Sequence, residues 1–145
     1  MIQDKEENRQ GAKAPRSEPS AGEDRIAKLI VHATYLVHKT IGPGLLESIY
    51  EACFCHELGK AGLAYRRQVP VPLIYDGLRF EEAFRLDVLV EDVIICELKA
   101  VEKIHPVHQA QLLSHLKLTR RNLGFLVNFN VPLIKDGIHR VISNA

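Results

Sequence analysis

The sequence lacks any apolar run that approaches the roughly 20 residues needed to cross a lipid bilayer. Its first ten residues, MIQDKEENRQ, are polar and charged, so they also lack the apolar core of a secretory signal peptide. A membrane partner is therefore not expected, and a cytoplasmic location follows by default.

Cysteine is scarce, with only Cys53, Cys55 and Cys96 in 145 residues. The number is odd and no C-x-x-C spacing occurs, whereas structural zinc sites and disulfide frameworks use paired cysteines at such spacings. On a helix, Cys53 and Cys55 would point about 200° apart. These observations argue against a structural zinc site and against disulfides.

An excess of charge of either sign is missing as well, because 19 Lys and Arg face 18 Asp and Glu, for a net charge of +1. Any contact with nucleic acid must therefore come from local basic patches. The candidate phosphate-binding residues are Arg66, Arg67, Arg120 and Arg121, with Arg79, Arg85 and Lys117 as further candidates. Scattered solvated charges are the alternative interpretation for most of them.

What the chain does contain is typical of one soluble globular domain. It is 46% hydrophobic and 26% charged, and 145 residues allow one core but not two full ones. Residues 1–22 are polar and mixed in charge, with Gly, Pro and Ser, so they cannot bury enough apolar surface to offset their ordering entropy. We therefore predict a disordered tail over 1–22 and a single domain over 23–145.

Three segments have the apolar period of an amphipathic helix. Gly42-Pro43-Gly44 separates the first two, since it stops a helix and permits a sharp change of direction. His105-Pro106 opens the third, because proline is favoured at the first helical position. Asp24 is interpreted as the capping acid of the first helix. The expected helices cover residues 24–41, 45–58 and 105–118. The stripe expected along one side of the second helix is Leu46, Ile49, Tyr50, Cys53 and Glu57, and that of the third is Val107, Ala110, Leu113 and Leu116 or Lys117.

Between the second and third helices, the chain is predicted to form a three-stranded antiparallel meander. Pro70 and Pro72 exclude a helix and confine the first strand to a sheet edge, and Asp76-Gly77 is a strong hairpin signal. The expected strands cover residues 65–75, 78–90, 93–100, 123–129 and 138–142. This order, ααβββαβ(β), predicts an α/β (α+β mixed) fold with a mostly antiparallel or mixed sheet of four to five strands flanked by helices.

Three charged residues, Asp87, Glu97 and Lys99, lie inside the apolar strand pair FRLDVLVEDVIICELKA. Charged side chains are rarely buried without a partner. Glu97 and Lys99 are two residues apart on one strand, so they share a face at a spacing of about 7 Å. Two carboxylates and a lysine on an apolar sheet suggest a divalent-metal site for phosphoryl transfer. The alternative is a routine Glu/Lys pair on an edge or an exposed face.

Whether Asp87 can join Glu97 depends on the turn between their strands. A two-residue turn after Val90 would place Asp87 on the face opposite Glu97. A three-residue loop or bulge, pairing Val90 with Ile94, would place both carboxylates on one face. The site hypothesis therefore predicts an irregularity near residues 91–93.

The order of elements, with an acid early on the second helix, an aspartate on the second strand and Glu-x-Lys on the third, resembles the PD-(D/E)XK nuclease superfamily, the restriction-endonuclease-like fold. Within it, the chain resembles the small GxxExxY proteins, because residues 44–50, GLLESIY, match the naming motif position by position. Further matching stretches are VHKTIGPGLLES, RQVPVPLIYDG, ELKAVEKIHPVHQAQLLSHL and VNFNVPLIKDGIHRVI. The resemblance covers essentially residues 24–142.

The resemblance implies roles for the residues of the strand pair. Asp87 would be the central metal ligand and Glu97 the second, with the Leu98 backbone carbonyl as a third oxygen. Lys99 would orient or help to deprotonate the attacking water and offset developing negative charge.

Two residues on helices would complete the implied site. Glu47 would hold a metal-bound water or a second metal, although spacing alone favours a helix-start acid or the N3 partner of a Gly44 cap. Gln111 would contact the lysine, a ligand or a phosphate. His115 stands where similar sequences often have tyrosine.

The implied function is a metal-dependent nuclease that hydrolyses phosphodiester bonds of nucleic acid in repair, recombination or defence; DNA is the first candidate substrate, and the choice between DNA and RNA is open. The implied cofactor is Mg²⁺, with Mn²⁺ as a substitute, because a hard cation that keeps several waters needs few protein oxygens. The alternatives are a non-catalytic nucleic-acid- or protein-binding module that retains the fold, and a purely structural acid and lysine network. The oligomeric state is open, although a homodimer would enlarge the surface offered to a duplex.

Overall fold

The computed structural model describes residues 20–144, and its elements follow the expected order ααβββαββ. The helices are α1 (Ala21–Ile41), α2 (Glu47–Lys60) and α3 (Pro106–Leu118). The strands are β1 (Tyr65–Tyr75), β2 (Leu78–Val90), β3 (Ile94–Lys99), β4 (Leu123–Asn128) and β5 (Ile138–Ile142), with a 3-10 turn, η1 (Ile134–Gly137), before the last. Within this part of the chain, no helix combines the length and apolar character needed to span a membrane.

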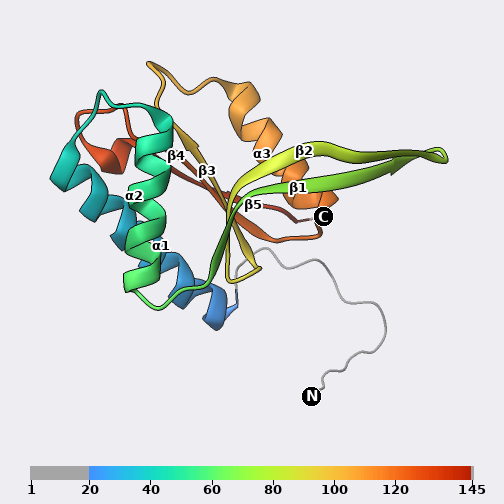
Figure 1. Cartoon of the computed structure of the whole chain (residues 1–145), viewed down its shortest axis with the longest axis horizontal. Coiled ribbons are helices and arrows are strands. Elements are labelled where there is room, and N and C mark those ends of the chain that lie inside the picture. Colours follow the sequence, from blue (N-terminus) through green and yellow to red (C-terminus); the bar gives the residue numbers. More distant parts are fainter. Residues whose placement is uncertain (1–19, 145) are drawn as a thin grey trace.

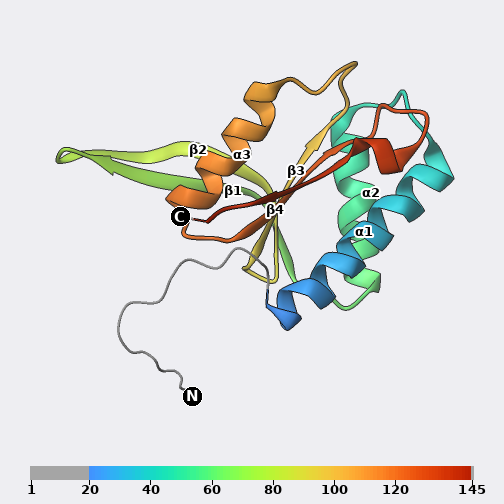
Figure 2. The same ribbon diagram turned by 180° about the vertical axis from the view of Figure 1, so that it is seen from behind.

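The five strands form one mixed sheet in the order β1-β2-β3-β4-β5, as Figure 1 and, from behind, Figure 2 show. The first three strands are an antiparallel meander, α3 carries the chain over to a parallel β4, and β5 returns antiparallel to β4. Pro70 and Pro72 lie in β1 at the sheet edge, where a missing amide donor is tolerated. The predicted fold class and restriction-endonuclease-like architecture are confirmed.

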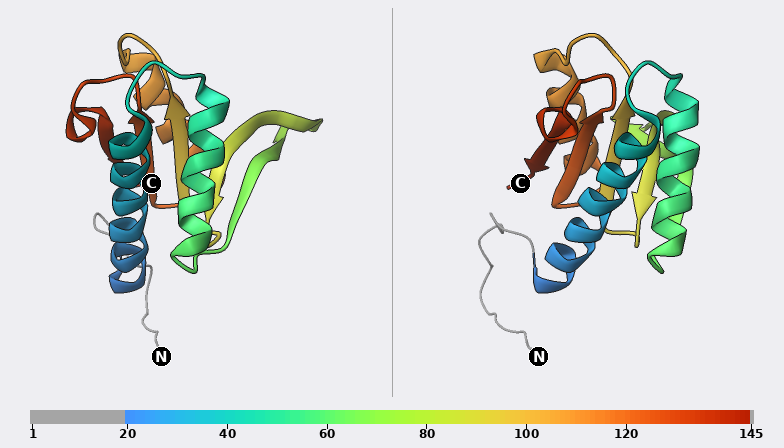
Figure 3. Two further views of the ribbon diagram at one scale, coloured as in Figure 1. Left: turned by 60° about the vertical axis from the view of Figure 1, so that its left-hand side comes forward. Right: turned by 90° about the vertical axis from the view of Figure 1, so that its left-hand side faces the viewer.

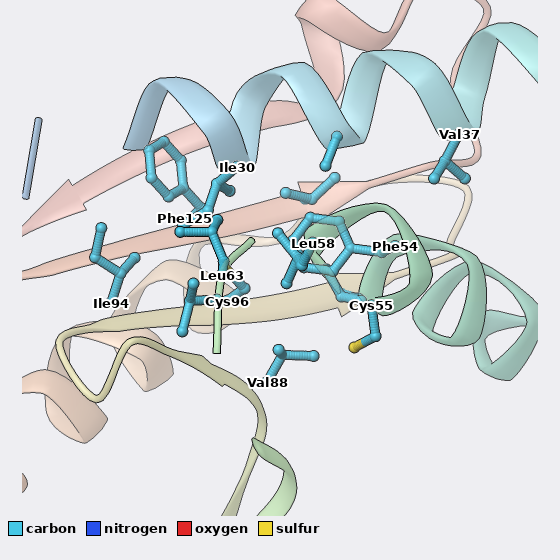
Figure 4. Close-up of a cluster of buried hydrophobic side chains, with 14 of the residues drawn as sticks. Ile30, Val37, Phe54, Cys55, Leu58, Leu63, Val88, Ile94, Cys96 and Phe125 are labelled. Carbon is cyan, nitrogen blue, oxygen red and sulfur yellow. The ribbon is translucent and has the colours of Figure 1, made fainter. Parts of the chain in front are cut away.

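Helices cover both faces of the sheet (Figure 3). The larger core cluster joins α1 and α2 to one face, through side chains such as Ile30, Phe54, Leu58 and Phe125 (Figure 4). A smaller cluster joins α3 to the other face. Burying each large apolar side chain contributes about 1.5–3 kcal/mol to the free energy of folding. The strands between the two layers are therefore held firmly, and β3 is the one that carries Glu97 and Lys99.

The first helix begins earlier than predicted. Ser20 caps it: the Ser20 hydroxyl accepts a hydrogen bond from the Glu23 amide at 3.2 Å, and the Glu23 carboxylate accepts one from the Ser20 amide at 3.0 Å. This capping box, and not Asp24, starts the helix because it satisfies two free amides at once. Residues 20–22 of the predicted tail thus belong to the helix start, while residues 1–19 lie outside the described part.

The stripes expected on two helices are correct only in part. On α2, Tyr50 is buried as expected, but Leu46 is 72% and Ile49 44% exposed, and the helix also buries Glu51, Phe54, Cys55 and Leu58. On α3, Leu116 is buried as expected together with Leu112, whereas Val107 and Ala110 are exposed. Both helices have apolar residues on more than one side, so the period alone did not determine which stripe meets the sheet.

The first two strands continue past the sheet as a two-stranded projection, residues 69–86, which we call the arm (Figure 1). Asp76 and Gly77 close its tip with φ values of 49° and 82°, as the predicted Asp-Gly hairpin turn requires. A register irregularity lies between Val71 and Leu73. The arm begins directly beside Asp87.

Candidate active site

The loop between β2 and β3 has three residues, as the site hypothesis requires. The pairs are Val90 with Ile94, Leu89 with Ile95 and Val88 with Cys96. Glu91 and Asp92 adopt φ values of 52° and 60°, which fit the extra residue into a tight connection. The predicted irregularity is confirmed, and continuing this register places Asp87 opposite Glu97.

Beyond the Val88–Cys96 pair, β2 and β3 separate. There, carboxylate side chains instead of backbone carbonyls accept the hydrogen bonds between the two strands. The Asp87 amide donates to Oε2 of Glu97 at 3.2 Å, and the Leu98 amide donates to Oδ2 of Asp87 at 2.9 Å. Each carboxylate thus accepts an amide hydrogen of the opposite strand. These two contacts fix both acids where β2 turns away into the arm.

The environment of the two acids disfavours their ionised forms. Burial is the largest cause that raises the pKa of Glu97, to about 8, and the adjacent Asp87 charge adds to it. Burial also raises the pKa of Asp87, to about 6, helped by the charges of Glu47 and Glu51. The amide hydrogen bonds and Lys99 act in the opposite direction on both pKa values. A cation between the carboxylates would relieve this cost.

The donor set fits a hard divalent cation that keeps most of its water. In residues 20–144, no group of three or more His, Cys, Asp or Glu side chains gathers closely enough to enclose a metal. Two carboxylates do lie together, and Mg²⁺ is commonly held by one or two carboxylates with waters completing the octahedron. Cys96 points into the opposite core cluster, so thiolate ligation is not available.

Lys99 lies at the end of β3 between the acids and α3. Burial lowers the pKa of His108 and His115 on α3, and the charge of Lys99 adds to this effect; the same charge opposes the rise in the pKa of Asp87 and Glu97. Lys99 is half-buried, and no carboxylate of the described chain lies within 4.0 Å of its ammonium. The ammonium is therefore near the carboxylates without being neutralised by direct contact.

The two predicted helix-borne residues are exposed. Glu47 is the first residue of α2, preceded by Leu46 as the cap, so the Gly44-cap interpretation was wrong. Gln111 lies on α3 and makes no side-chain hydrogen bond to residues 20–144. Near it, the His115 ring stacks on Phe84 of the arm at 4.2 Å between ring centres. Glu47 affects the acids through its charge, whereas no interaction ties Gln111 to them.

Glu51, which the sequence analysis missed, is a further acid of this region. It is buried one turn after Glu47 and accepts hydrogen bonds from Arg67 at 2.9 Å and Gln68 at 2.8 Å. Its charge contributes to the raised pKa of Asp87. The sequence could have indicated Glu51, because residues four apart on a helix share a face. A helix face that directs Glu47 toward the two acids therefore also carries Glu51.

The four candidate phosphate-binding arginines divide into two places. Arg67 pairs with Glu51 beside the acids. Arg66 and Arg121 both bind the Asp92 carboxylate, at 3.1 and 2.9 Å, in the loop between β2 and β3. Arg120 lines a pocket with Arg121 at the same loop. Three of the four arginines therefore gather at the loop end of the sheet and one lies at the carboxylates.

Tyr50 holds the loop that precedes Glu47. Its hydroxyl donates to the Gly42 carbonyl at 2.6 Å and accepts from the Leu45 amide at 3.1 Å. Its ring stacks on Phe129, with ring centres 4.6 Å apart and planes within 4°. The tyrosine of the GxxExxY motif thus links the start of α2 to the end of β4.

We expect Tyr50→Phe to lower the free energy of unfolding by roughly 1–2 kcal/mol, because it removes both hydrogen bonds of the buried Tyr50 side chain, to the Gly42 carbonyl and from the Leu45 amide, while keeping the ring stack. Urea denaturation measures the loss. Tyr35→Phe is the matched control, since Tyr35 is an exposed tyrosine of α1. Equal stability of the two variants would contradict a bridging role for the hydroxyl.

Comparison with known proteins identifies the family of the chain. A family model described as the PD-(D/E)XK nuclease superfamily matches residues 24–141. No curated protein and no solved structure matches the chain significantly. The match spans α1 to β5 and includes every residue placed above at the carboxylates.

Proposed function

The chain belongs to the PD-(D/E)XK nuclease superfamily, and on this premise we propose that it is a Mg²⁺-dependent nuclease that cleaves phosphodiester bonds of DNA. The observation that supports this most is the pair of half-buried Asp87 and buried Glu97, held by the amides of opposite strands where β2 and β3 separate. Such a pair is costly to bury without a cation. We propose further that the protein is of the GxxExxY type, is located in the cytoplasm and acts in repair, recombination or defence.

The residues that would hold the metal are Asp87, Glu97 and the backbone carbonyl of Leu98, with Glu47 acting through a bound water. Mn²⁺ would substitute for Mg²⁺, because both accept carboxylate, carbonyl and water ligands. When bound, the cation supplies charge for the phosphate and lowers the pKa of a coordinated water.

The reaction is the addition of water across a phosphorus–oxygen bond. The water oxygen bonds to phosphorus as the bond to the leaving sugar oxygen breaks; the water gives up one proton and the leaving oxygen gains one. Lys99 would orient that water and stabilise the charge that builds on the phosphate oxygens. Its lack of a direct carboxylate partner within the described chain leaves the ammonium available for this role.

Substrate contacts would come from both arginine positions. Arg67 lies beside the acids, whereas Arg66, Arg120 and Arg121 surround Asp92 at the neighbouring loop. Each phosphate neutralised at either place adds to the salt dependence of binding. Asp92 already offsets part of the charge of Arg66 and Arg121, so we expect modest affinity.

Lys99→Ala is expected to lower the rate of cleavage about 100-fold without abolishing Mg²⁺ binding, because it removes the ammonium and leaves both carboxylates. Single-turnover cleavage of labelled DNA measures the rate, and titration calorimetry measures the metal. Lys103→Ala, an exposed lysine in the loop before α3, is the matched control. A Lys99→Ala variant as fast as Lys103→Ala would remove Lys99 from the mechanism.

The experiment that tests the function as a whole is a cleavage panel. Linear, circular, single-stranded and branched DNA, with RNA counterparts, are incubated with Mg²⁺, Mn²⁺ or EDTA. Cleavage that needs a metal supports the proposal. Calorimetric metal binding without cleavage of any substrate would instead support the non-catalytic binding module, and no metal binding would support a structural acid network.

A further inference from the structure

The arm leaves one edge of β2 without a neighbouring strand. β3 pairs with β2 only from Val88 to Val90. The Asp87 amide points away from β1, since it donates to Glu97, and alternate residues direct their backbone groups to the same edge. The Arg85 amide therefore points to the outer edge too, where no strand of residues 20–144 pairs with it. Figures 1 and 3 show the arm standing clear of the remaining sheet.

The other edge of the arm is protected against pairing. Pro70 lies opposite Arg85, whose amide points outward, so the ring nitrogen of Pro70 lies on the outer edge of β1. Pro70 and Pro72 together remove two donors from that edge. Prolines of this kind are a common means of preventing edge-to-edge association. The stretch of β2 from Leu78 to Leu86 contains no proline, although β2 has two residues more than β1 between the pairs Leu73–Phe80 and Val71–Phe84. The part of this edge in regular register, from Leu78 to Phe80, is not blocked by proline.

One face of the arm carries an apolar stripe that α3 covers only in part. Near the body, Val69, Val71, Phe84 and Leu86 pack in the cluster with α3. Farther out, the cross-strand pairs are Leu73 with Phe80 and Tyr75 with Leu78. Of these outer residues, Tyr75 is 68%, Leu78 59% and Phe80 47% exposed. An isolated two-stranded ribbon with such a face is marginal in water, and added strands would stabilise it.

The charges of the arm identify the kind of partner. The arm carries Asp76, Arg79, Glu81, Glu82 and Arg85, a net charge of −1 from three acids and two bases. This balance disfavours a polyanion such as nucleic acid. Two β2 strands paired antiparallel about Phe80, however, would place Arg79 of each copy opposite Glu81 of the other. Within one chain, Arg79 pairs with Glu81 at 2.8 Å and Arg85 pairs with Glu82 at 2.7 Å. Pairing two copies would therefore join two Arg79–Glu81 ion pairs into one network and would place no like charges directly opposite each other.

We propose that the chain forms a homodimer in which the outer edges of two β2 strands pair antiparallel about a two-fold axis near Phe80, giving a four-stranded sheet across the two arms. The exposed stripe of one arm offers only a few hundred Å², less than the roughly 800 Å² per partner of a standard stable interface. The dimer is accordingly expected to dissociate with a constant on the order of 1–100 µM. It does not depend on the proposed nuclease activity.

Sedimentation velocity of the full chain over about 1 to 300 µM tests the proposal, because this range brackets the expected constant. The wild type should shift from monomer to dimer, and Phe80→Lys should stay a monomer. Ile74→Lys is the matched control: Ile74 is 63% exposed, pairs with Arg79 on the opposite face of the arm, and should leave the dimer intact. Circular dichroism and thermal unfolding check that both variants remain folded.

A charge exchange tests the pairing register independently of apolar contact. Arg79→Glu and Glu81→Arg should each weaken the dimer about tenfold, through like charges directly opposite one another. The double variant should restore wild-type association. A wild type that stays a monomer at the highest concentration would overturn the proposal, and so would a dimer that survives Phe80→Lys or a double variant as weak as the single ones.

Discussion

Asp87→Asn is expected to abolish Mg²⁺-dependent cleavage, with a loss of roughly 10³-fold or more, while the protein stays folded. The substitution keeps the size of the side chain, and the amide oxygen can still accept the hydrogen bond that the Leu98 amide donates at 2.9 Å. What it removes is one negative charge from the acid that would be the central ligand. Single-turnover cleavage with saturating Mg²⁺ gives the rate, and calorimetry gives the affinity for the metal.

The control for Asp87→Asn is Asp136→Asn, an exposed aspartate in η1 on the far side of β4 from β2. It removes the same charge from the chain without touching the carboxylate pair, so its cleavage rate should equal that of the wild type. Activity of Asp87→Asn within a factor of ten of this control would show that the carboxylate is not a metal ligand, and the assignment of the site would fail.

Glu97→Gln should have two opposite effects: a roughly 10³-fold loss of cleavage and a gain in stability of the metal-free protein at pH 8. The gain follows from burial, since Glu97 is only 9% exposed and its pKa is raised to about 8 by burial and by Asp87. Glutamine keeps the acceptor for the Asp87 amide but carries no charge. We expect the free energy of unfolding in EDTA to rise by roughly 1–3 kcal/mol at pH 8.

The raised pKa of Glu97 determines how the stability of the metal-free protein changes with pH. Between the ordinary pKa of a glutamate and the raised value near 8, the native state binds more protons than the unfolded state. Stability of the metal-free wild type is therefore greatest at low pH within this window and falls as the pH rises through 8. In Glu97→Gln that fall should be largely absent from pH 6 to 8, where only the tail of the Asp87 titration remains.

Urea unfolding in EDTA at a series of pH values measures both variants, with Glu102→Gln, an exposed glutamate before α3, as the control. A wild type whose stability rises from pH 6 to 8, or a Glu97→Gln variant that is less stable than Glu102→Gln at pH 8, would contradict the unfavourable burial of the charge. Added Mg²⁺ should stabilise the wild type far more than Glu97→Gln, because ligand binding to the native state raises its stability.

The sequence predicted the strands and the loop well because their constraints are local or chemical. Prolines at alternate positions of a strand, such as Pro70 and Pro72, confine that strand to a sheet edge, and Asp76-Gly77 favours a hairpin turn. The three-residue loop was predicted from chemistry: Asp87 and Glu97 can meet only if Val90 pairs with Ile94, and it does. A functional requirement thus determined the register where the local turn signal was ambiguous.

What the sequence did not predict depends on tertiary packing. Glu51 is an ordinary helical glutamate until Arg67 and Gln68 of β1 reach it across the fold. The buried stripe of α2 was predicted only in part, because Leu46 and Ile49 are as apolar as the residues that meet the sheet. Likewise, the reciprocal amide contacts of Asp87 and Glu97 arise only where two strands part, which no residue pattern records.

The loop at residues 91–93 has a consequence for how this chain tolerates change. Surface loops usually accept insertions and deletions more readily than the elements they connect. Here, removing one residue would shift β3 by one position, turning Glu97 and Lys99 toward the core that Cys96 and Leu98 now occupy. The length of this exposed loop is therefore as restricted as the identity of the acids it aligns, although none of its three side chains is one of the proposed metal ligands.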